Sequence, residues 1–258
     1  MTTQFDKIYV ISLTLNKSRQ EFVKKQMNEL GLDFEFIYGV DFYNIKYNFD
    51  NNPITWPLLF NGDGFNGGTF GCAVSHYSAV FQAYEFGYNN VLILEDDICF
   101  IKDKKLIEEY LNNIPNDADF ITYDPRFYNK EYYYELLKVM IKDKNKKWIL
   151  LENSNNGLIG GMMYGLMNRE TMKLYLNAQH NNFTAADSIH GIFRYPNDNI
   201  KRYVANKCII TDHYNIKNNL NFNEISEFYV NIYKNIDKTL SKDSFNIPND
   251  YSIFTRYN

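Results

Sequence analysis

The stretch Lys7-Ile-Tyr-Val-Ile-Ser-Leu13 lies close to the start of the chain and is rich in β-branched and aromatic residues. That composition is typical of a strand. Apolar residues then recur at helical spacing, at Phe22, Val23, Met27 and Leu30. Gly31 follows as a stop signal, and residues 34–38 again have the composition of a strand. This β-α-β order predicts a parallel sheet that is covered by helices.

The same patterns predict the elements that follow a loop-like stretch from residue 44 to residue 70. We expect helices at 72–86, 103–113, 131–142 and 169–178, and strands at 91–94, 119–123, 148–151, 158–166 and 203–210. The predicted fold is therefore α/β, with a mostly parallel sheet flanked by helices. Since no linker is evident before about residue 215, we expect one domain over residues 1–215 and an extension over residues 216–258.

The extension carries a helical apolar pattern. Its apolar residues fall on one face of a helix, at Ile225, Phe228, Tyr229, Ile232 and Ile236. The favoured interpretation is that this face packs on the domain. The alternatives are a face for a second copy of the chain, giving a homo-oligomer, or a peripheral contact with a membrane surface.

Composition limits the function classes. The chain has 258 residues and a formal net charge of −4, so it lacks the basic character that non-specific nucleic-acid binding needs. Hydrophobic residues make up 45% and charged residues 22%, which is typical of a globular protein rather than a disordered one.

The cysteines and the N-terminus bear on location. Cys72, Cys99 and Cys208 are odd in number and far apart, which favours a reducing compartment over a disulfide framework. The polar first residues do not form a secretory signal, and no apolar run approaches 18 residues. We therefore expect a cytoplasmic protein without a transmembrane helix, from a bacterial or viral source.

The strongest chemical signal is the run Glu95-Asp96-Asp97, which directly follows the apolar strand Val91-Leu-Ile-Leu94. Ligands of open α/β sheets bind at the carboxyl ends of strands. Three carboxylates there repel one another unless a cation offsets their charge. Because side chains alternate along a strand, Glu95 and Asp97 are expected to point one way and Asp96 the other. Two hard oxygen ligands together with phosphate oxygens suit Mg²⁺ or Mn²⁺, and a solvated strand end is the alternative.

A second signal is Gly71-Cys72-Ala-Val-Ser75-His76, at the predicted start of a helix. A helix N-terminus with a nearby Ser and His can receive phosphate oxygens. A capped helix with a hydrogen-bonded histidine is an equally good interpretation. Cys72 has no base beside it in the sequence, so a buried thiol is favoured over a nucleophile.

Weaker candidates lie elsewhere. Asp187 precedes an apolar helical stretch and is typical of a helix cap, and His213 follows a predicted strand and could be a further metal ligand. The run from Gly62 to Gly67 matches a dinucleotide-binding pattern, but it does not close the first strand and is better read as a loop. The chain has no Gly-x-Ser-x-Gly, Walker loop or His-Glu-x-x-His motif.

Together these motifs resemble glycosyltransferase family 25. The stretch Ile8–Leu13 with Arg19 is similar to the family's opening strand and the arginine that follows it. Tyr38-Gly-Val-Asp41 resembles a short turn of the family, although Phe42 stands where the family has glycine. The spacing from Gly71-Cys72-Ala-Val-Ser-His76 to Leu92-Ile-Leu-Glu-Asp-Asp97 resembles the family's most specific segment.

The resemblance implies a GT-A type fold, a UDP-hexose donor (galactose or glucose), a divalent metal such as Mn²⁺, and an inverting transfer. The acceptor would be a glycan, a lipid-linked saccharide or a protein hydroxyl. We expect Glu95, Asp97 and His213, each at or after a strand end, to hold this metal. By its position in the family pattern Asp187 is the base, and Asp124, at the end of another predicted strand, is its rival. The residues implied to bind or support the donor are Ser12, Arg19, Asp41, Ser75, His76 and Asp96.

Two other functions are compatible with the same residues. A non-catalytic relative could bind sugar nucleotides or glycans. A metal-dependent phosphohydrolase or nucleotidyltransferase could use the same acids. Release of a nucleoside diphosphate, rather than a monophosphate or pyrophosphate, distinguishes glycosyl transfer from the second alternative.

Overall fold

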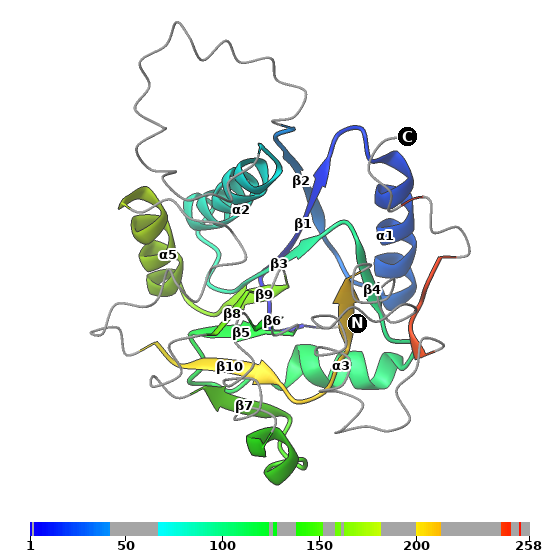
Figure 1. The fold of residues 1–258 in the computed structure, drawn as a ribbon, viewed down its shortest axis with the longest axis vertical. Coiled ribbons are helices and arrows are strands. Elements are labelled where there is room, and N and C mark those ends of the chain that lie inside the picture. The colour runs from blue at the N-terminus through cyan, green and yellow to red at the C-terminus, as the bar shows by residue number, and fades with distance from the viewer. Residues whose placement is uncertain are drawn as a thin grey trace, which may run out of the picture.

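The structure is a computed structural model of the 258-residue chain (Figure 1). It describes residues 1, 3–41, 67–123, 126–127, 138–151, 158–160, 163–181, 200–212, 244–248 and 253. Within these ranges no helix is both long enough and apolar enough to cross a membrane.

The opening β-α-β unit is confirmed. Strand β1 (Lys7–Leu13) leads into helix α1 (Lys17–Leu30) and strand β2 (Glu35–Gly39), and β1 pairs with β2 in parallel. Gly31 ends α1 in the left-handed conformation with φ 66°, which glycine adopts without a Cβ penalty. The predicted stop signal is therefore the actual C-cap.

The central sheet has the order β2-β1-β3-β9-β5-β10-β7. Its other strands are β3 (Val91–Glu95), β5 (Phe120–Thr122), β7 (Trp148–Leu151), β9 (Tyr164–Leu166) and β10 (Arg202–Ala205). Strand β3 is parallel to β1, while β9 is antiparallel to both of its neighbours β3 and β5. Strand β10 is parallel to β5, and β7 is antiparallel to β10. Five of these strands thus run one way and two the other, which confirms the predicted α/β fold with a mostly parallel sheet.

Helices cover both faces of the sheet, and the strand residues alternate between them. Ile8 and Val10 of β1 and Leu92 and Leu94 of β3 join a core with α1 and with α3 (Lys104–Asn112). Their neighbours along the same strands pack against α2 (Gly67–Glu85) and α5 (Arg169–Asn181). Figure 1 shows α2 and α5 on one side of β1 and β3 and α1 on the other. The run of four apolar residues in β3 follows from this arrangement, since a strand covered on both faces needs no polar alternation.

Two small sheets were not predicted. Strand β4 (Ile98–Phe100) pairs antiparallel with β11 (Ile210–Asp212), and β6 (Arg126–Phe127) pairs antiparallel with β8 (Leu158–Gly160). The single strand predicted over 158–166 is therefore β8 and β9 in different sheets, and the one predicted over 203–210 is β10 and the start of β11. A strand that changes partner keeps its apolar composition, so composition alone did not reveal the breaks.

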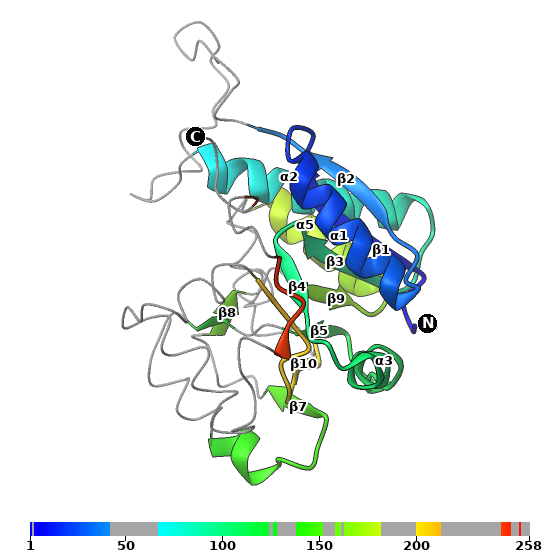
Figure 2. The same cartoon turned by 90° about the vertical axis from the view of Figure 1, so that its right-hand side faces the viewer.

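The C-terminal segment returns to the domain beside β4. Phe245 lies opposite Ile101 in an antiparallel bridge and is buried in the core. The Asn246 N–H donates to the Phe100 carbonyl at 2.8 Å. Figure 2 shows this segment alongside β4. The helix predicted around residues 225–236 lies outside the described residues, and only the end of the helix predicted over 131–142 is described, as helical residues 138–142.

Candidate active site

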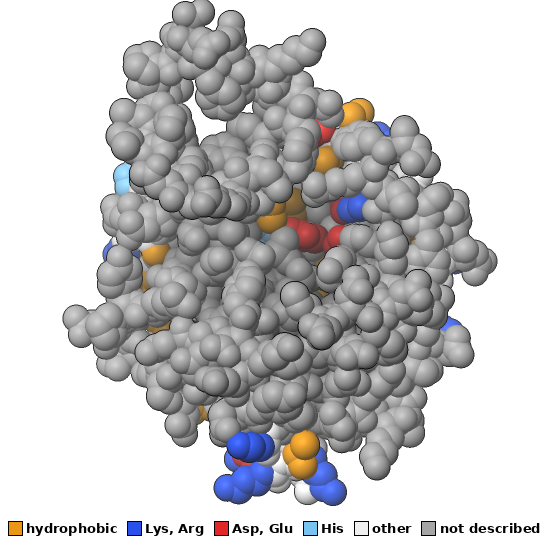
Figure 3. Space-filling view, in the orientation of Figure 1, with side chains coloured by type: hydrophobic (Ala, Val, Ile, Leu, Met, Phe, Trp, Pro, Cys, Tyr) orange, Lys and Arg blue, Asp and Glu red, His pale blue; other side chains and the backbone are white. Residues whose placement is uncertain are grey.

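Three carboxylates follow one another at the carboxyl end of β3. Glu95 is the last residue of the strand, residues 96 and 97 form a turn, and β4 begins at Ile98. Acidic and basic side chains lie next to one another over this end of β3 (Figure 3). The site therefore lies at the carboxyl edge of the sheet, where ligands of α/β proteins bind.

Asp96 points to the α1 side of the sheet and is held by three donors. Ser12 Oγ, at the end of β1, donates to Oδ2 at 2.7 Å, and Asn16 Nδ2 donates to the same oxygen at 3.0 Å. Arg19 Nη1 lies 2.9 Å from Oδ1. Gln20 supports this set because its Nε2 donates to Ser12 Oγ and to the Leu13 carbonyl. Both oxygens of Asp96 are therefore engaged within the protein.

The ion pair of Arg19 and Asp96 is buried. Burial raises the pKa of the Asp96 carboxyl, Arg19 opposes this rise, and the charge of Asp97 adds to it. For Arg19, burial disfavours the charged form, but the Asp96 and Asp97 carboxylates outweigh burial and raise the pKa of the guanidinium. Arg19 is thus a permanent cation that compensates the acidic turn. Its Nε also donates to the Ile253 carbonyl at 3.2 Å, which ties the C-terminal segment to the same group.

Asp97 is only partly consistent with the alternation predicted for it. Its Oδ2 lies 3.9 Å from the Arg19 Nη1 that binds Asp96. Glu95 and Asp96 do point to opposite sides, but Asp97 lies within reach of the same guanidinium as Asp96. The physical reason is that β3 ends at Glu95, so the period of two does not extend through the turn.

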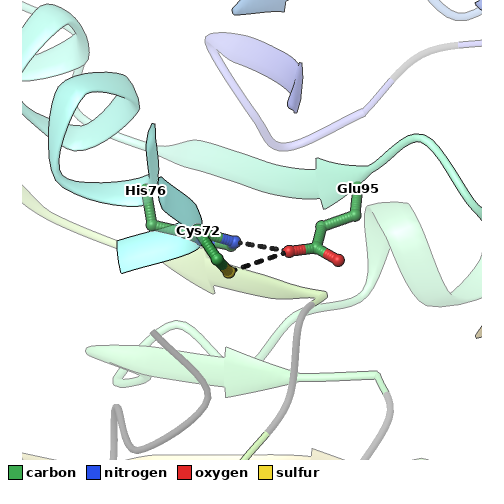
Figure 4. Close-up of side chains that lie close together, drawn as sticks. All are labelled: Cys72, His76 and Glu95. Atoms are coloured by element: carbon green, nitrogen blue, oxygen red, sulfur yellow. Dashed lines mark hydrogen bonds and ion pairs between the residues drawn. The ribbon is translucent and has the colours of Figure 1, made fainter. Parts of the chain in front are cut away.

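Glu95 points to the α2 side and meets a thiol and an imidazole (Figure 4). Cys72 Sγ lies 3.3 Å and His76 Nε2 3.0 Å from Glu95 Oε1. The other ring nitrogen of His76, Nδ1, lies 3.0 Å from the Tyr164 hydroxyl. Burial raises the pKa of Tyr164 well above its usual value, so this hydroxyl stays neutral and can either donate or accept.

The position of Ser75 and His76 in the helix corrects the sequence interpretation. Helix α2 begins at Gly67, so both residues lie about two turns inside it and not at its start. Ser75 Oγ donates to the Gly71 carbonyl at 2.5 Å and accepts the Val40 N–H at 3.3 Å. Of the two interpretations left open for this segment, the helix N-terminus does not apply to Ser75 and His76, and the hydrogen-bonded histidine is what the structure shows. Gly67 and Gly68 look loop-like in sequence but begin the helix.

Most of the predicted donor-site residues lie below the surface. Those less than a tenth exposed are Ser12, Arg19, Ser75, His76 and Asp96, whereas Asp41 is half-buried just after β2. Glu95 and Asp97 retain 21% and 16% exposure of their side chains. Among the predicted site residues that the structure describes, the charged ones with solvent access are therefore Glu95, Asp97 and Asp41. Asp187, His213 and Asp124 lie outside the described residues.

Sequence reasoning missed three members of the site. Asn16 precedes α1 and was predicted only as part of a helix start, yet its side chain donates to Asp96 rather than capping its own helix. Gln20 and Tyr164 have no motif around them, because a hydrogen bond across the fold leaves no local pattern. Cys72, predicted to be a buried thiol without a base, is half-buried with His76 and Glu95 beside it.

Comparison with known proteins identifies the family. The model of "Glycosyltransferase family 25 (LPS biosynthesis protein)" matches residues 5–191. No curated protein matches the chain. Among solved structures, the chain is similar to a glycosyltransferase involved in the glycosylation of the major capsid of PBCV-1, with a TM-score of 0.45 and 9% identity over 88% of this chain and 98% of that one. Because the family model covers well over half of the chain, the protein belongs to glycosyltransferase family 25.

Proposed function

We propose that this protein moves a hexose from a UDP-sugar to a hydroxyl acceptor with inversion at the sugar, and that it depends on a divalent cation. Galactose and glucose are the favoured sugars. The observation that carries the proposal is a difference between the three carboxylates at the end of β3. Asp96 is saturated by internal donors, whereas Glu95 and Asp97 keep solvent access at the carboxyl edge of the sheet.

The side chains fit a hard divalent cation. Glu95 and Asp97 offer carboxylate oxygens, which Mn²⁺ and Mg²⁺ prefer, and His213 is proposed as a third ligand. When bound, such a cation would offset the charge that develops on the departing diphosphate. Asp96 is excluded as a ligand in this arrangement because both of its oxygens are bound to Ser12, Asn16 and Arg19.

The buried residues of the site act by positioning. Arg19 and Ser12 hold Asp96, and this fixes the turn that carries Asp97. His76 forms a hydrogen bond with Glu95 from the α2 side of the sheet. Ser75 of α2 accepts a hydrogen bond from the Val40 N–H, just after β2. The five buried residues support the donor site without touching the donor; they are Ser12, Arg19, Ser75, His76 and Asp96. Asp41 is proposed to contact the donor directly because it is only partly buried, at the same edge of the sheet.

An inverting displacement needs a base on the acceptor side of the sugar. We propose Asp187 for this role. Asp187→Asn keeps the shape of the side chain, so transfer should fall by about 10²–10⁴-fold while donor and metal binding persist. Asp124→Asn is the matched comparison: if it lowers transfer and Asp187→Asn does not, the base is Asp124.

The experiment is a panel of nucleotide sugars with Mn²⁺, in which the released nucleotide is identified. Glycosyl transfer or donor hydrolysis releases a nucleoside diphosphate, and chelation of the metal should stop it. Release of a monophosphate, phosphate or pyrophosphate would indicate the phosphohydrolase or nucleotidyltransferase. Donor binding without turnover would indicate a non-catalytic relative. Glycans, lipid-linked saccharides and protein hydroxyls are the acceptors to test with the active donor.

A further inference from the structure

Cys72, His76 and Glu95 form a cluster that the proposed transfer does not use in full. Cys72 and His76 are four residues apart on α2, so they share one face of that helix. Glu95 reaches them from the end of β3, as Figure 4 shows. Among the described residues, this is the group of three potential metal ligands whose ligand atoms all lie within 4.8 Å of one another.

Two of the three distances between these ligand atoms are close to those of a tetrahedral zinc site, and the third is within 4.8 Å. Zinc binds thiolate sulfur at about 2.3 Å and nitrogen or oxygen at about 2.0–2.2 Å, which places oxygen and nitrogen ligands about 3.3 Å apart and oxygen and sulfur about 3.5 Å apart. Here Glu95 Oε1 lies 3.0 Å from His76 Nε2 and 3.3 Å from Cys72 Sγ. Closing a metal site therefore requires movements of a few tenths of an ångström along these two edges.

We propose that Cys72, His76 and Glu95 bind a zinc-class divalent cation. Thiolate and imidazole are ligands that favour Zn²⁺ over Mg²⁺ or Mn²⁺, so this site differs in kind from one made of carboxylates alone. Binding releases the thiol proton of Cys72 to solvent. The proton on His76 moves to Nδ1, which leaves the Nε2 lone pair for the metal.

Tyr164 provides the support that a metal-bound histidine needs. A ligating histidine holds its orientation by donating its other ring N–H to a fixed acceptor. The Tyr164 hydroxyl lies 3.0 Å from His76 Nδ1 and can accept from it once the proton has moved. Both residues are fully buried, so the imidazole is already oriented toward Glu95.

A cation can reach the cluster from solvent, and its binding would affect the proposed transfer. Cys72 and Glu95 are only partly buried, so the cluster opens on the side that faces the carboxyl edge of the sheet. Glu95 is also a proposed ligand of the hard cation. Zinc binding would therefore withdraw Glu95 and inhibit transfer, a consequence that rests on the proposed function, whereas the binding itself does not.

The test uses Co²⁺ as a spectroscopic probe on the purified full-length chain. A cysteine thiolate bound to Co²⁺ gives a charge-transfer absorption in the near ultraviolet, which carboxylate ligands do not give. We expect the parent chain to show this absorption at one equivalent of Co²⁺ and to lose it when Zn²⁺ is added. Cys72→Ser should abolish the absorption and weaken Zn²⁺ binding by more than about 100-fold, since the loss of an outer partner alone costs about 10–100-fold.

Cys208→Ser is the matched control. Cys208 donates to the Ile210 carbonyl at 3.4 Å, a bond that a serine hydroxyl can keep, so this variant should retain the absorption and the affinity. Asp97→Asn should retain both as well. Tyr164→Phe should lower the affinity for Zn²⁺ by about 10–100-fold.

The proposal is overturned if the parent chain gives no charge-transfer absorption, if Cys208→Ser removes it and Cys72→Ser does not, or if Asp97→Asn weakens zinc binding as much as Cys72→Ser. Unfolding curves establish that each variant is folded. If Cys72→Ser does not fold, His76→Gln tests the affinity instead: it should weaken Zn²⁺ binding strongly, and an unchanged affinity would overturn the proposal. Since no measurement here follows transfer, these results are separate from the fate of the proposed function.

Discussion

On the α1 face of the sheet, Asp96 is held by a buried guanidinium and two neutral donors, whereas on the α2 face Glu95 is held by a thiol and an imidazole. The two residues are adjacent in sequence, but their partners differ in whether they can give up a proton. The guanidinium of Arg19 cannot give up its proton, so the α1 face is fixed. Cys72 can give up its thiol proton when a cation binds, and His76 can offer Nε2 while its proton sits on Nδ1. The end of β3 thus carries one carboxylate with a structural role, Asp96, and one whose partners can be replaced by a cation, Glu95.

The largest effect on stability is expected from Arg19→Met. This change leaves Asp96 charged and buried without its cation, and breaking a buried pair from one side costs about 3–5 kcal/mol. Urea unfolding measures the loss. Lys24→Met is the control, because Lys24 and its partner Glu21 form an exposed pair whose loss should leave the unfolding midpoint almost unchanged. Equal effects of the two substitutions would contradict the structural role of the α1 face.

A smaller loss is expected on the α2 face. His76→Phe removes a buried partner of Tyr164 and should lower the free energy of unfolding by about 1–3 kcal/mol, the cost of an unsatisfied buried polar group. Adding Tyr164→Phe replaces both partners and should restore part of the loss. If the double variant is less stable than His76→Phe, the bond between these two side chains does not explain the effect.

The smallest loss of stability is expected at the contact between Gly39, at the end of β2, and Ser75 of α2. A Cβ on Gly39 would lie 2.7 Å from Ser75 Oγ, which is itself bound to Gly71 and Val40. Gly39→Ala should therefore cost about 1 kcal/mol, at the low end of overpacking. The same substitution should cost less in a Ser75→Ala background, where the Oγ is absent. Urea unfolding measures both costs. An identical cost in the two backgrounds would show that the contact with Ser75 Oγ is not the reason why Gly39→Ala destabilises the protein.

Much of the fold could be predicted because its signals are local. The strand over residues 7–13, the stop at Gly31 and the buried strand before Glu95 each have a composition that decides them, and all three are confirmed. The breaks between β8 and β9 and between β10 and β11 could not be predicted. At these points the chain changes its partner strand, which depends on contacts distant in sequence.

The position of the site could be predicted from the sequence, but the hydrogen bonds and ion pairs within it could not. The sequence placed the acids at the carboxyl end of a buried strand, and the structure confirms that placement. It did not reveal that Arg19 reaches Asp96 and Asp97 together, or that Tyr164 lies behind His76. These contacts join residues 77 and 88 positions apart, so no periodic pattern reports them. The roles of Asp187 and His213 stay predictions.

The most direct test of the account compares Asp96→Asn with Asp97→Asn in two assays, metal-dependent release of nucleoside diphosphate and unfolding in urea. We predict that Asp97→Asn lowers release by about 10²–10³-fold, as expected for losing one electrostatic contact to developing charge, with little change in stability. Asp96→Asn should lower the free energy of unfolding by about 1.5–3 kcal/mol, because Arg19 loses its charged partner. Normal metal dependence in Asp97→Asn, or a greater loss of stability in Asp97→Asn than in Asp96→Asn, would contradict the division of roles at the end of β3.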